Sequence, residues 1–312
     1  NHGPCIAFDC ASHEKKLQVW DGPGGTMSMV EIPGKPGEFL AVQKFFRLYD
    51  WEEACLVRVR PKTEGGYEVR ELFTLPYLHR FDVLLRGGNL WLVACTLAAH
   101  KQTRDDWSCP GSVYAAPLPD EWDGEVCLKE VMGGCFQNHG YTRLSGDGYD
   151  IGLFTCEQGV FELVPPEDTD GEFTVRKIMD RAVSDADVID IDGDGEAEIA
   201  TIERFHGWYF RIYKKLEGEY RLVYQHPEVT EFYHVVRAGT LVGKPCFIGG
   251  CRRGKQQLFA VYWDTEAKTF VTETIDEGVG PSNALIYHGP SGDVVYAADR
   301  EAQEAAVYYV EP

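Results

Sequence analysis

A unit of two short apolar strands joined by a tight glycine turn recurs six times along this 312-residue chain. Each unit occupies about 50 residues, which leaves room for two further strands before the next unit begins. Four antiparallel strands of this length make one blade of a β-propeller. The repeat therefore predicts an all-β chain that folds as a β-propeller of four-stranded antiparallel blades. The turn glycines, by subtraction 47 to 58 residues apart, are Gly34, Gly88, Gly146, Gly193, Gly243 and Gly292.

The first residues match the middle of a later unit. The interval from Pro4 to Leu17 equals that from Pro245 to Leu258, and each segment soon reaches a Trp-Asp pair. Residues 4–21 are therefore expected to be the second and third strands of a further blade, whereas the last unit lacks a fourth strand. Terminal strands that share one blade would close the ring and remove its open edges. We expect seven blades in a single domain over residues 1–312, with six blades as the alternative.

The composition agrees with an all-β fold and limits the classes of binding partner. The chain has 33 glycines and 12% aromatic residues, and its formal net charge is −20. Such an excess of carboxylates argues against nucleic acid or an anionic membrane as the main partner. No apolar run reaches the roughly 18 residues that a membrane-spanning helix needs.

Ten cysteines occur, and no two have the spacing of a zinc finger. Cys5 and Cys10 lie five apart on an expected strand, and so do Cys246 and Cys251. An odd offset on a strand directs two side chains to opposite faces, so neither pair can form a local disulfide. We expect free, mostly buried thiols in a reducing compartment, and thus a cytoplasmic location.

An acidic loop (residues 190–198) separates two apolar strands, expected at 186–189 and 199–202. Its alternating carboxylates and its glycines suit a hard, oxygen-seeking cation such as calcium. Position twelve is Thr201 rather than glutamate, so the loop is not an EF-hand. We expect a structural Ca²⁺ here, with a metal-free acidic turn as the alternative. The candidate ligands are Asp190, Asp192, Asp194, Glu196 and Glu198.

Three of the nine histidines precede first strands at equivalent places in different repeats, namely His79, His139 and His234. First strands line the central channel of a propeller, so these side chains are expected to converge there. Imidazole can act as a metal ligand or as a general base near neutral pH. A second divalent metal at these histidines is one expectation, and ordinary packing or turn roles are the alternative.

The loops between second and third strands form a second layer on the same predicted face. They hold equal numbers of basic and acidic residues, although the rest of the chain is strongly acidic. Such a face suits a small anionic or polyhydroxylated carbohydrate ligand, on whose rings tryptophans can stack. A solvated rim, with the tryptophans packed between blades, is the alternative. With Arg80 beside His79, the candidate binding residues are Arg80, Lys101, Arg104, Trp107, Arg252 and Trp208.

Two local patterns carry a resemblance to known families. The run from Ala186 through the acidic loop to Ile199 resembles the FG-GAP/VCBS repeat of integrin-type propellers, which implies Ca²⁺ between two strands of a blade. Glu198 stands where that repeat usually has aspartate. Residues 203–207, with 77–82 and 138–140, are similar to the propeller of aldos-2-ulose dehydratase, and the architecture is similar to seven-bladed polysaccharide lyases. No cupin-like region follows here.

The resemblance implies a lyase or dehydratase that carries out β-elimination on a keto-sugar or uronide in the central funnel. In that hypothesis His139, His234 or His79 is the base or a metal ligand. Arg204, Arg80 or a histidine-bound cation would stabilise the oxyanion, and His206 or Tyr141 would protonate the leaving oxygen.

A non-catalytic propeller that binds a glycan or a protein is the alternative. Nucleophile-elbow, phosphate-loop and dinucleotide motifs are missing from the sequence. A glycosidase with paired carboxylates remains open, because Asp105, Asp106 and Glu203 are on the candidate face.

Overall fold

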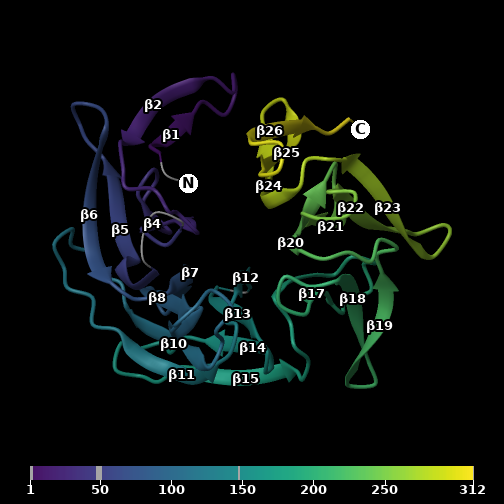
Figure 1. Cartoon of the computed structure of the whole chain (residues 1–312), viewed down its shortest axis with the longest axis horizontal. Coiled ribbons are helices and arrows are strands. Elements are labelled where there is room, and N and C mark those ends of the chain that lie inside the picture. The colour runs from purple at the N-terminus through teal and green to yellow at the C-terminus, as the bar shows by residue number, and fades with distance from the viewer. Residues whose placement is uncertain (1–2, 47–50, 147, 312) are drawn as a thin grey trace. The chain divides into compact units, whose positions relative to one another are not determined.

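The computed structural model describes residues 3–46, 51–146 and 148–311. The chain divides into two compact units, Asn1–Ile178 and Met179–Pro312, and Figure 1 colours them from purple to teal and from green to yellow. Strands dominate both units. The single helical segment in the described ranges is the turn η1 (Trp51–Glu53). No described helix has the length and hydropathy needed to cross a membrane.

Unit 1 contains four antiparallel sheets. The first is a two-stranded sheet of β1 (Cys5–Phe8) and β2 (Lys15–Trp20). The second comprises β3 (Met29–Glu31), β4 (Phe39–Gln43), β5 (Cys55–Pro61) and β6 (Tyr67–Thr74). The third comprises β7 (Leu78–Arg86), β8 (Asn89–Thr96), β9 (Ala98–His100), β10 (Cys109–Pro117) and β11 (Lys129–Cys135). The fourth comprises β12 (Gly140–Ser145), β13 (Asp150–Cys156), β14 (Gly159–Val164) and β15 (Thr174–Met179), whose last residue begins unit 2.

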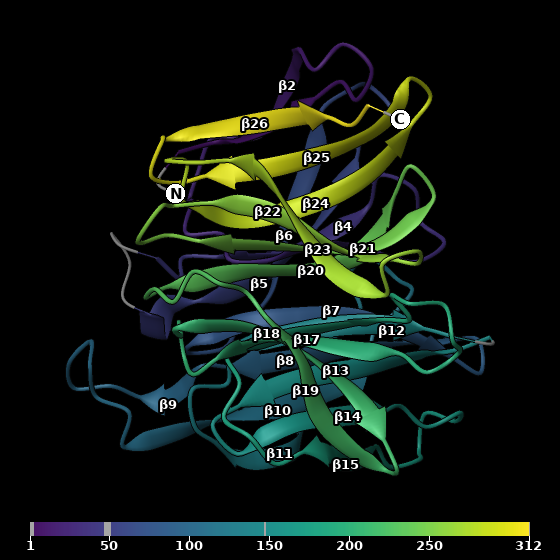
Figure 2. The ribbon, with the colours of Figure 1, turned by 90° about the vertical axis from the view of Figure 1, so that its right-hand side faces the viewer.

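Unit 2 contains three antiparallel sheets (Figures 1 and 2). The first strand of the middle sheet contacts the first strands of the other two. One comprises β16 (Asp185–Ile189), β17 (Glu198–Glu203), β18 (Tyr209–Leu216) and β19 (Glu219–Gln225). The next comprises β20 (Tyr233–Leu241), β21 (Lys244–Cys251), β22 (Leu258–Asp264) and β23 (Thr269–Asp276). The last comprises β24 (Pro281–Gly289), β25 (Gly292–Asp299) and β26 (Glu304–Tyr309).

The sheet count corrects the expected number of blades. The described residues form six sheets of three to five strands, so the alternative of six blades is right and seven is wrong. Strands β1 and β2 do pair with each other, as the match with residues 245–264 predicts. They gain no further strand within the described ranges, and a lone two-stranded sheet is not a blade. A blade shared by the two chain ends stays a prediction.

The six predicted hairpins are confirmed as first-to-second strand pairs. Their turns need a backbone that bends with positive φ, and Gly193 (φ 76°) and Gly243 (φ 73°) supply it where a Cβ would be strained. In the predicted turn 146–148, Asp147 lies outside the described residues.

The core follows the strand order within each sheet. Every residue of β17 is buried, whereas the outer strand β19 is mostly exposed. Phe210, Phe247 and Phe259 fill the space between two sheets of unit 2 with almost no exposed surface. All ten cysteines are free thiols, and six of them are buried.

A buried carboxylate links two sheets of unit 2. Asp187 on β16 is 6% exposed and accepts hydrogen bonds from the backbone N–H of Val188 and of Ala238 on β20, both at 2.9 Å. Burial raises the pKa of Asp187 to about 6, against the opposing effects of Arg237 and of these two hydrogen bonds. Between about pH 4 and 6, the folded state therefore holds a proton that the unfolded chain has already released.

This raised pKa predicts a pH-dependent loss of stability. Below pH 4 the Asp187 carboxyl is protonated in both states, and its contribution is lost as pH rises from about 4 through 6. A shift of two pKa units corresponds to about 3 kcal/mol. Urea unfolding of wild type and Asp187→Asn tests this. The unfolding free energy of wild type, relative to that of Asp187→Asn, should fall by about that amount between pH 4 and pH 7.5.

The exposed Asp170→Asn serves as the matched control for removal of one carboxylate. Parallel stability curves for wild type and Asp187→Asn over this range would contradict the raised pKa.

Candidate functional site

A tight loop, residues 203–208, joins β17 to β18 and carries His206. The Trp208 N–H donates to the Glu203 carbonyl at 2.8 Å, so the chain reverses within a few residues. A Cβ at Gly207 would lie 2.0 Å from the carbonyl carbon and oxygen of Glu203. Only glycine fits there, and this close approach fixes the position of His206.

The start of this loop is held by a buried carboxylate. Glu203 is 4% exposed and accepts hydrogen bonds from Arg211 Nη1 (2.7 Å), Tyr213 Oη (2.7 Å) and Thr201 Oγ1 (3.0 Å). Burial, together with the bond to Glu203, raises the pKa of Tyr213 to about 12. A buried charge satisfied in this way is rigid, so Glu203 is structural here and is not available as a glycosidase carboxylate.

The His206 ring lies between two phenylalanine rings. Its centroid is 4.1 Å from that of Phe205 and 4.3 Å from that of Phe232, with both pairs stacked. The Phe232 N–H donates to the His206 carbonyl at 3.0 Å. His206 and Phe232 both have positive φ, at 45° and 68°. Such non-glycine values are uncommon and concentrate at functional sites.

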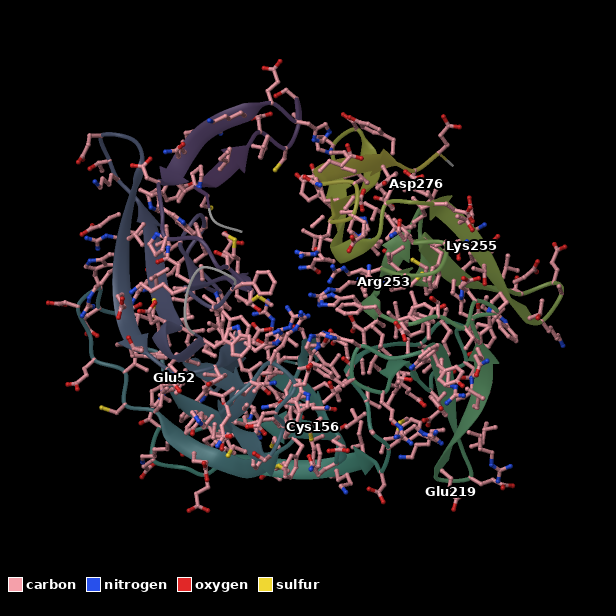
Figure 3. All side chains as sticks on the ribbon, in the orientation of Figure 1. Glu52, Cys156, Glu219, Arg253, Lys255 and Asp276 are labelled. Carbon is pink, nitrogen blue, oxygen red and sulfur yellow. The ribbon has the colours of Figure 1, made fainter. Side chains whose placement is uncertain are left out.

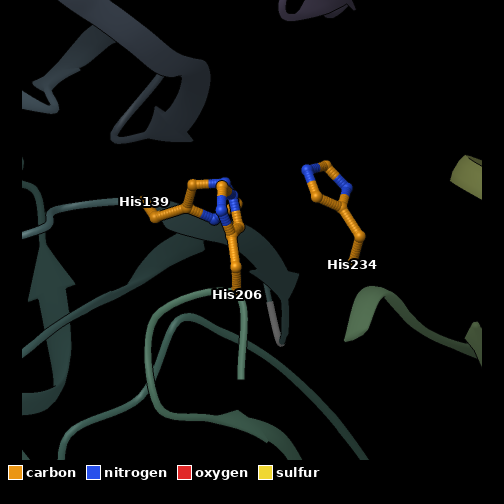
Figure 4. A group of neighbouring side chains, drawn as sticks. All are labelled: His139, His206 and His234. Carbon is orange, nitrogen blue, oxygen red and sulfur yellow. The ribbon is translucent and has the colours of Figure 1, made fainter. Parts of the chain in front are cut away.

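His234, the second residue of β20, lies beside this stack. Its ring centroid is 5.3 Å from that of His206 (Figure 4), and ring nitrogens of the two lie within 4.8 Å of each other. His234 Nδ1 is 2.8 Å from the Ser282 carbonyl oxygen, which can only accept. The proton must therefore be on Nδ1, and in the neutral ring the lone pair is on Nε2.

Arg252, at the end of the same aromatic group, is positioned by Glu301. Its guanidinium lies over the Phe232 ring at 4.5 Å, and Nη2 donates to Glu301 Oε1 at 2.6 Å. The hydrogen bond from Arg252 lowers the pKa of Glu301. Arg253 and Lys255 continue this basic segment (Figure 3), and Arg253 is 3.9 Å from Glu301.

Unit 2 thus brings together three of the predicted residues, His206, His234 and Arg252. Arg204 and Trp208 lie on the same loop as His206, but both are exposed. No motif in the sequence indicates a role for Phe232 or Glu301. The only signals in the sequence are their positions. Phe232 lies directly before a predicted first strand, and Glu301 follows Arg300 in a predicted second-to-third loop.

Unit 1 brings together His79, His139 and Arg80. The two histidine rings are 4.5 Å apart at their centroids, and both side chains are buried. The His139 carbonyl accepts a hydrogen bond from Arg80 Nε at 3.2 Å and from His79 Nδ1 at 3.2 Å. These hydrogen bonds from two residues of β7 therefore attach β7 to the residue before β12.

Two further predictions in unit 1 have different outcomes. Lys101 Nζ lies 3.1 Å from the centroid of the Trp107 ring, and burial lowers the pKa of Lys101. Arg104 is exposed in the same loop. Tyr141, expected as a proton donor, is instead in the hydrophobic core, where its hydroxyl occupies the space that a Cβ on Gly152 would need. Burial raises its pKa well above the usual value, so Tyr141 is unsuited to that role.

The acidic loop holds a cation of its own chain. Lys214 Nζ is 2.6 Å from Asp192, 2.8 Å from Asp194 and 2.8 Å from Glu198. Burial alone would lower the Lys214 pKa, but hydrogen bonds to the three carboxylates outweigh it and raise the pKa. The bond from Lys214 lowers the pKa of Asp194. Of the other predicted ligands, Asp190 accepts backbone hydrogen bonds and Glu196 is exposed.

No family model matches the sequence, and no curated protein is significantly similar to it. Solved structures share its fold. The periplasmic gluconolactonase of Pseudomonas aeruginosa matches 99% of this chain and 88% of its own at 14% identity, with a TM-score of 0.65. Putative 6-phosphogluconolactonases from Bacteroides uniformis (15% identity, 98% and 87% coverage) and Bacteroides fragilis (14%, 97% and 85%) both have a TM-score of 0.62.

These likenesses correct the family and the function inferred from the sequence. The resemblance to FG-GAP/VCBS repeats, the dehydratase and the lyases is wrong, because no family model matches and the three structures named above are described as lactonases or putative lactonases. The expected β-elimination is wrong on the same ground, and the non-catalytic platform is not supported. At this identity the likeness shows the fold alone. The chain is a β-propeller of antiparallel, typically four-stranded blades.

Proposed function

We propose that this protein is a hydrolase that opens the ring of a small sugar-derived lactone, and that the site is the His206–His234–Arg252 group of unit 2. The observation that carries the proposal is His234, whose Nδ1–H is tied to the Ser282 carbonyl, so that Nε2 can accept a proton. The lactonases that share the fold over nearly the whole chain support the substrate class.

Lactone hydrolysis requires a general base, a group that stabilises the oxyanion and a general acid, and the proposed site has one residue for each role. His234 Nε2 takes a proton from water as the water oxygen attacks the lactone carbonyl carbon. The Arg252 guanidinium stabilises the negative charge that develops on the carbonyl oxygen. The bond between the carbonyl carbon and the ring oxygen then breaks, and His206 donates a proton to that oxygen. One water is consumed, and the product is an open-chain hydroxy acid.

The surroundings of the two histidines favour these different roles. His206 lies between two aromatic faces, and such faces attract a cation, so they stabilise the protonated ring that an acid requires. His234 donates to a carbonyl oxygen, an arrangement that a neutral ring satisfies while Nε2 stays a base. The proposal therefore assigns the acid to His206 and the base to His234 from their contacts.

Replacing the base tests the assignment. His234→Ala should lower kcat/KM for lactone hydrolysis by about 100-fold or more, because general-base catalysis contributes about 10²–10⁴-fold. Activity is measured on a panel of aldonolactones, with and without a phosphate group, by titrating the acid that ring opening releases. Thermal unfolding of the variant, measured alongside, shows whether the fold is kept.

The matched control is His288→Ala, which removes an exposed histidine of the same unit that pairs with Asp293 at the other end of its sheet. This variant should retain wild-type activity. Equal activity of His234→Ala and wild type would exclude His234 as the base, and no hydrolysis of any lactone by the wild type would exclude the proposed reaction.

A divalent metal on the same two rings is the alternative mechanism. Ring nitrogens of His206 and His234 within 4.8 Å of each other suit two ligands of one metal, and metal-binding histidines commonly donate their other N–H to a backbone carbonyl. Such a metal would take the Nε2 lone pair and activate the water itself.

Dialysis against a chelator separates the two mechanisms. Acid–base catalysis by the histidines predicts unchanged kcat after exhaustive dialysis against EDTA. Loss of activity that Zn²⁺ or Mn²⁺ restores would show instead that the rings serve as metal ligands.

A further inference from the structure

The acidic loop is not used by the proposed reaction, yet it contains a fully buried charge. Glu198, at the first position of β17, has no exposed surface. Its Oε2 accepts the Ile191 N–H at 3.0 Å, and its Oε1 is 2.8 Å from Lys214 Nζ. A buried carboxylate is stable only when it is paired, so this position requires a cation.

The register between β17 and β18 places a lysine, Lys214, beside Glu198. Ile199 on β17 is paired with Tyr213 on β18, which places Lys214 opposite Glu198 at the next step. The lysine side chain is 13% exposed, and its nitrogen is within hydrogen-bond distance of Asp192, Asp194 and Glu198. An ammonium group has three donors. Lys214 Nζ donates a hydrogen bond to Asp192 Oδ2 at 2.6 Å and forms ion pairs with Asp194 and Glu198, both at 2.8 Å.

The same oxygens are those that a calcium ion would need. Calcium binds carboxylate oxygens at about 2.3–2.6 Å, close to the distances at which Lys214 Nζ already lies. The remaining inner carboxylate, Asp190, accepts hydrogen bonds from the N–H groups of Gly193 and Gly195. An ammonium and a divalent ion cannot share this position, because they would repel each other strongly at such a distance.

We propose that the Lys214 ammonium is the resident cation of the acidic loop, in the place where the spacing of the carboxylates predicts Ca²⁺. The loop then keeps its conformation at any calcium concentration. A cation carried on the adjacent strand is always present at high effective concentration, so a free ion has to displace it to bind. Removal of the ammonium converts the loop into a calcium site.

Calcium titrations of wild type and Lys214→Met test the proposal. Methionine keeps most of the side-chain length and removes the charge. Wild type should show no heat of binding in calorimetry and a Tm that changes by less than about 1 °C between EGTA and 1 mM CaCl₂. Lys214→Met should have a lower Tm in EGTA, and 1 mM CaCl₂ should raise it by about 5 °C or more, as a ligand specific to the folded state does.

Lys214→Arg is the matched control, because it retains a positive charge at the same position and should give no calcium response. Stoichiometric binding of Ca²⁺ by wild type would overturn the proposal, and that measurement does not depend on how the variants fold. A Lys214→Met protein that folds and does not respond to Ca²⁺ would also overturn it.

Discussion

Antiparallel pairing of the first two strands in each sheet is the constraint on which the rest of unit 2 depends. It places the hairpin turn at one end of the sheet, and the start of the first strand together with the second-to-third loop at the other. The acidic loop is consequently at one end, while His206, His234 and Arg252 meet at the opposite end. At about 3.3 Å per residue, the six residues of β17, which joins the acidic loop to the His206 loop, separate these ends by about 20 Å. Structural and reactive charges are thus kept apart.

Within the proposed site, the positions of the side chains are set by groups to which the proposal assigns no catalytic role. The carboxylate of Glu203 and the absence of a side chain on Gly207 fix the loop, and the loop then fixes His206. Glu301 likewise orients Arg252, and the Ser282 carbonyl orients His234. Each side chain of the proposed site therefore has a side-chain or backbone partner that sets its orientation, which is what a preorganised site requires.

The parts of this structure that were predictable from sequence are those with local signals. A glycine between two apolar runs indicates a hairpin, and equivalent positions before first strands predicted that His79 and His139 would meet, as they do. His206 belongs to a second-to-third loop, so the repeat did not predict its contact with His234. The roles of Lys214 and Phe232 depend on cross-strand register and backbone conformation, which no short pattern records. Tyr141 follows His139 by two residues, but its strand directs it into the core. The family assignment failed because it depended on a few short blocks, and such blocks carry fold more readily than chemistry.

The most direct test of the account is a crystal structure of His234→Ala grown with an aldonolactone or its hydroxy-acid product. The account predicts the ligand at the His206–Arg252 end of unit 2, with its carboxyl or carbonyl oxygen on the Arg252 guanidinium and its ring-derived oxygen near His206. A ligand bound only elsewhere, such as in the 400 Å³ cavity of unit 1 lined by Lys35, Arg143 and Asp150, would contradict it.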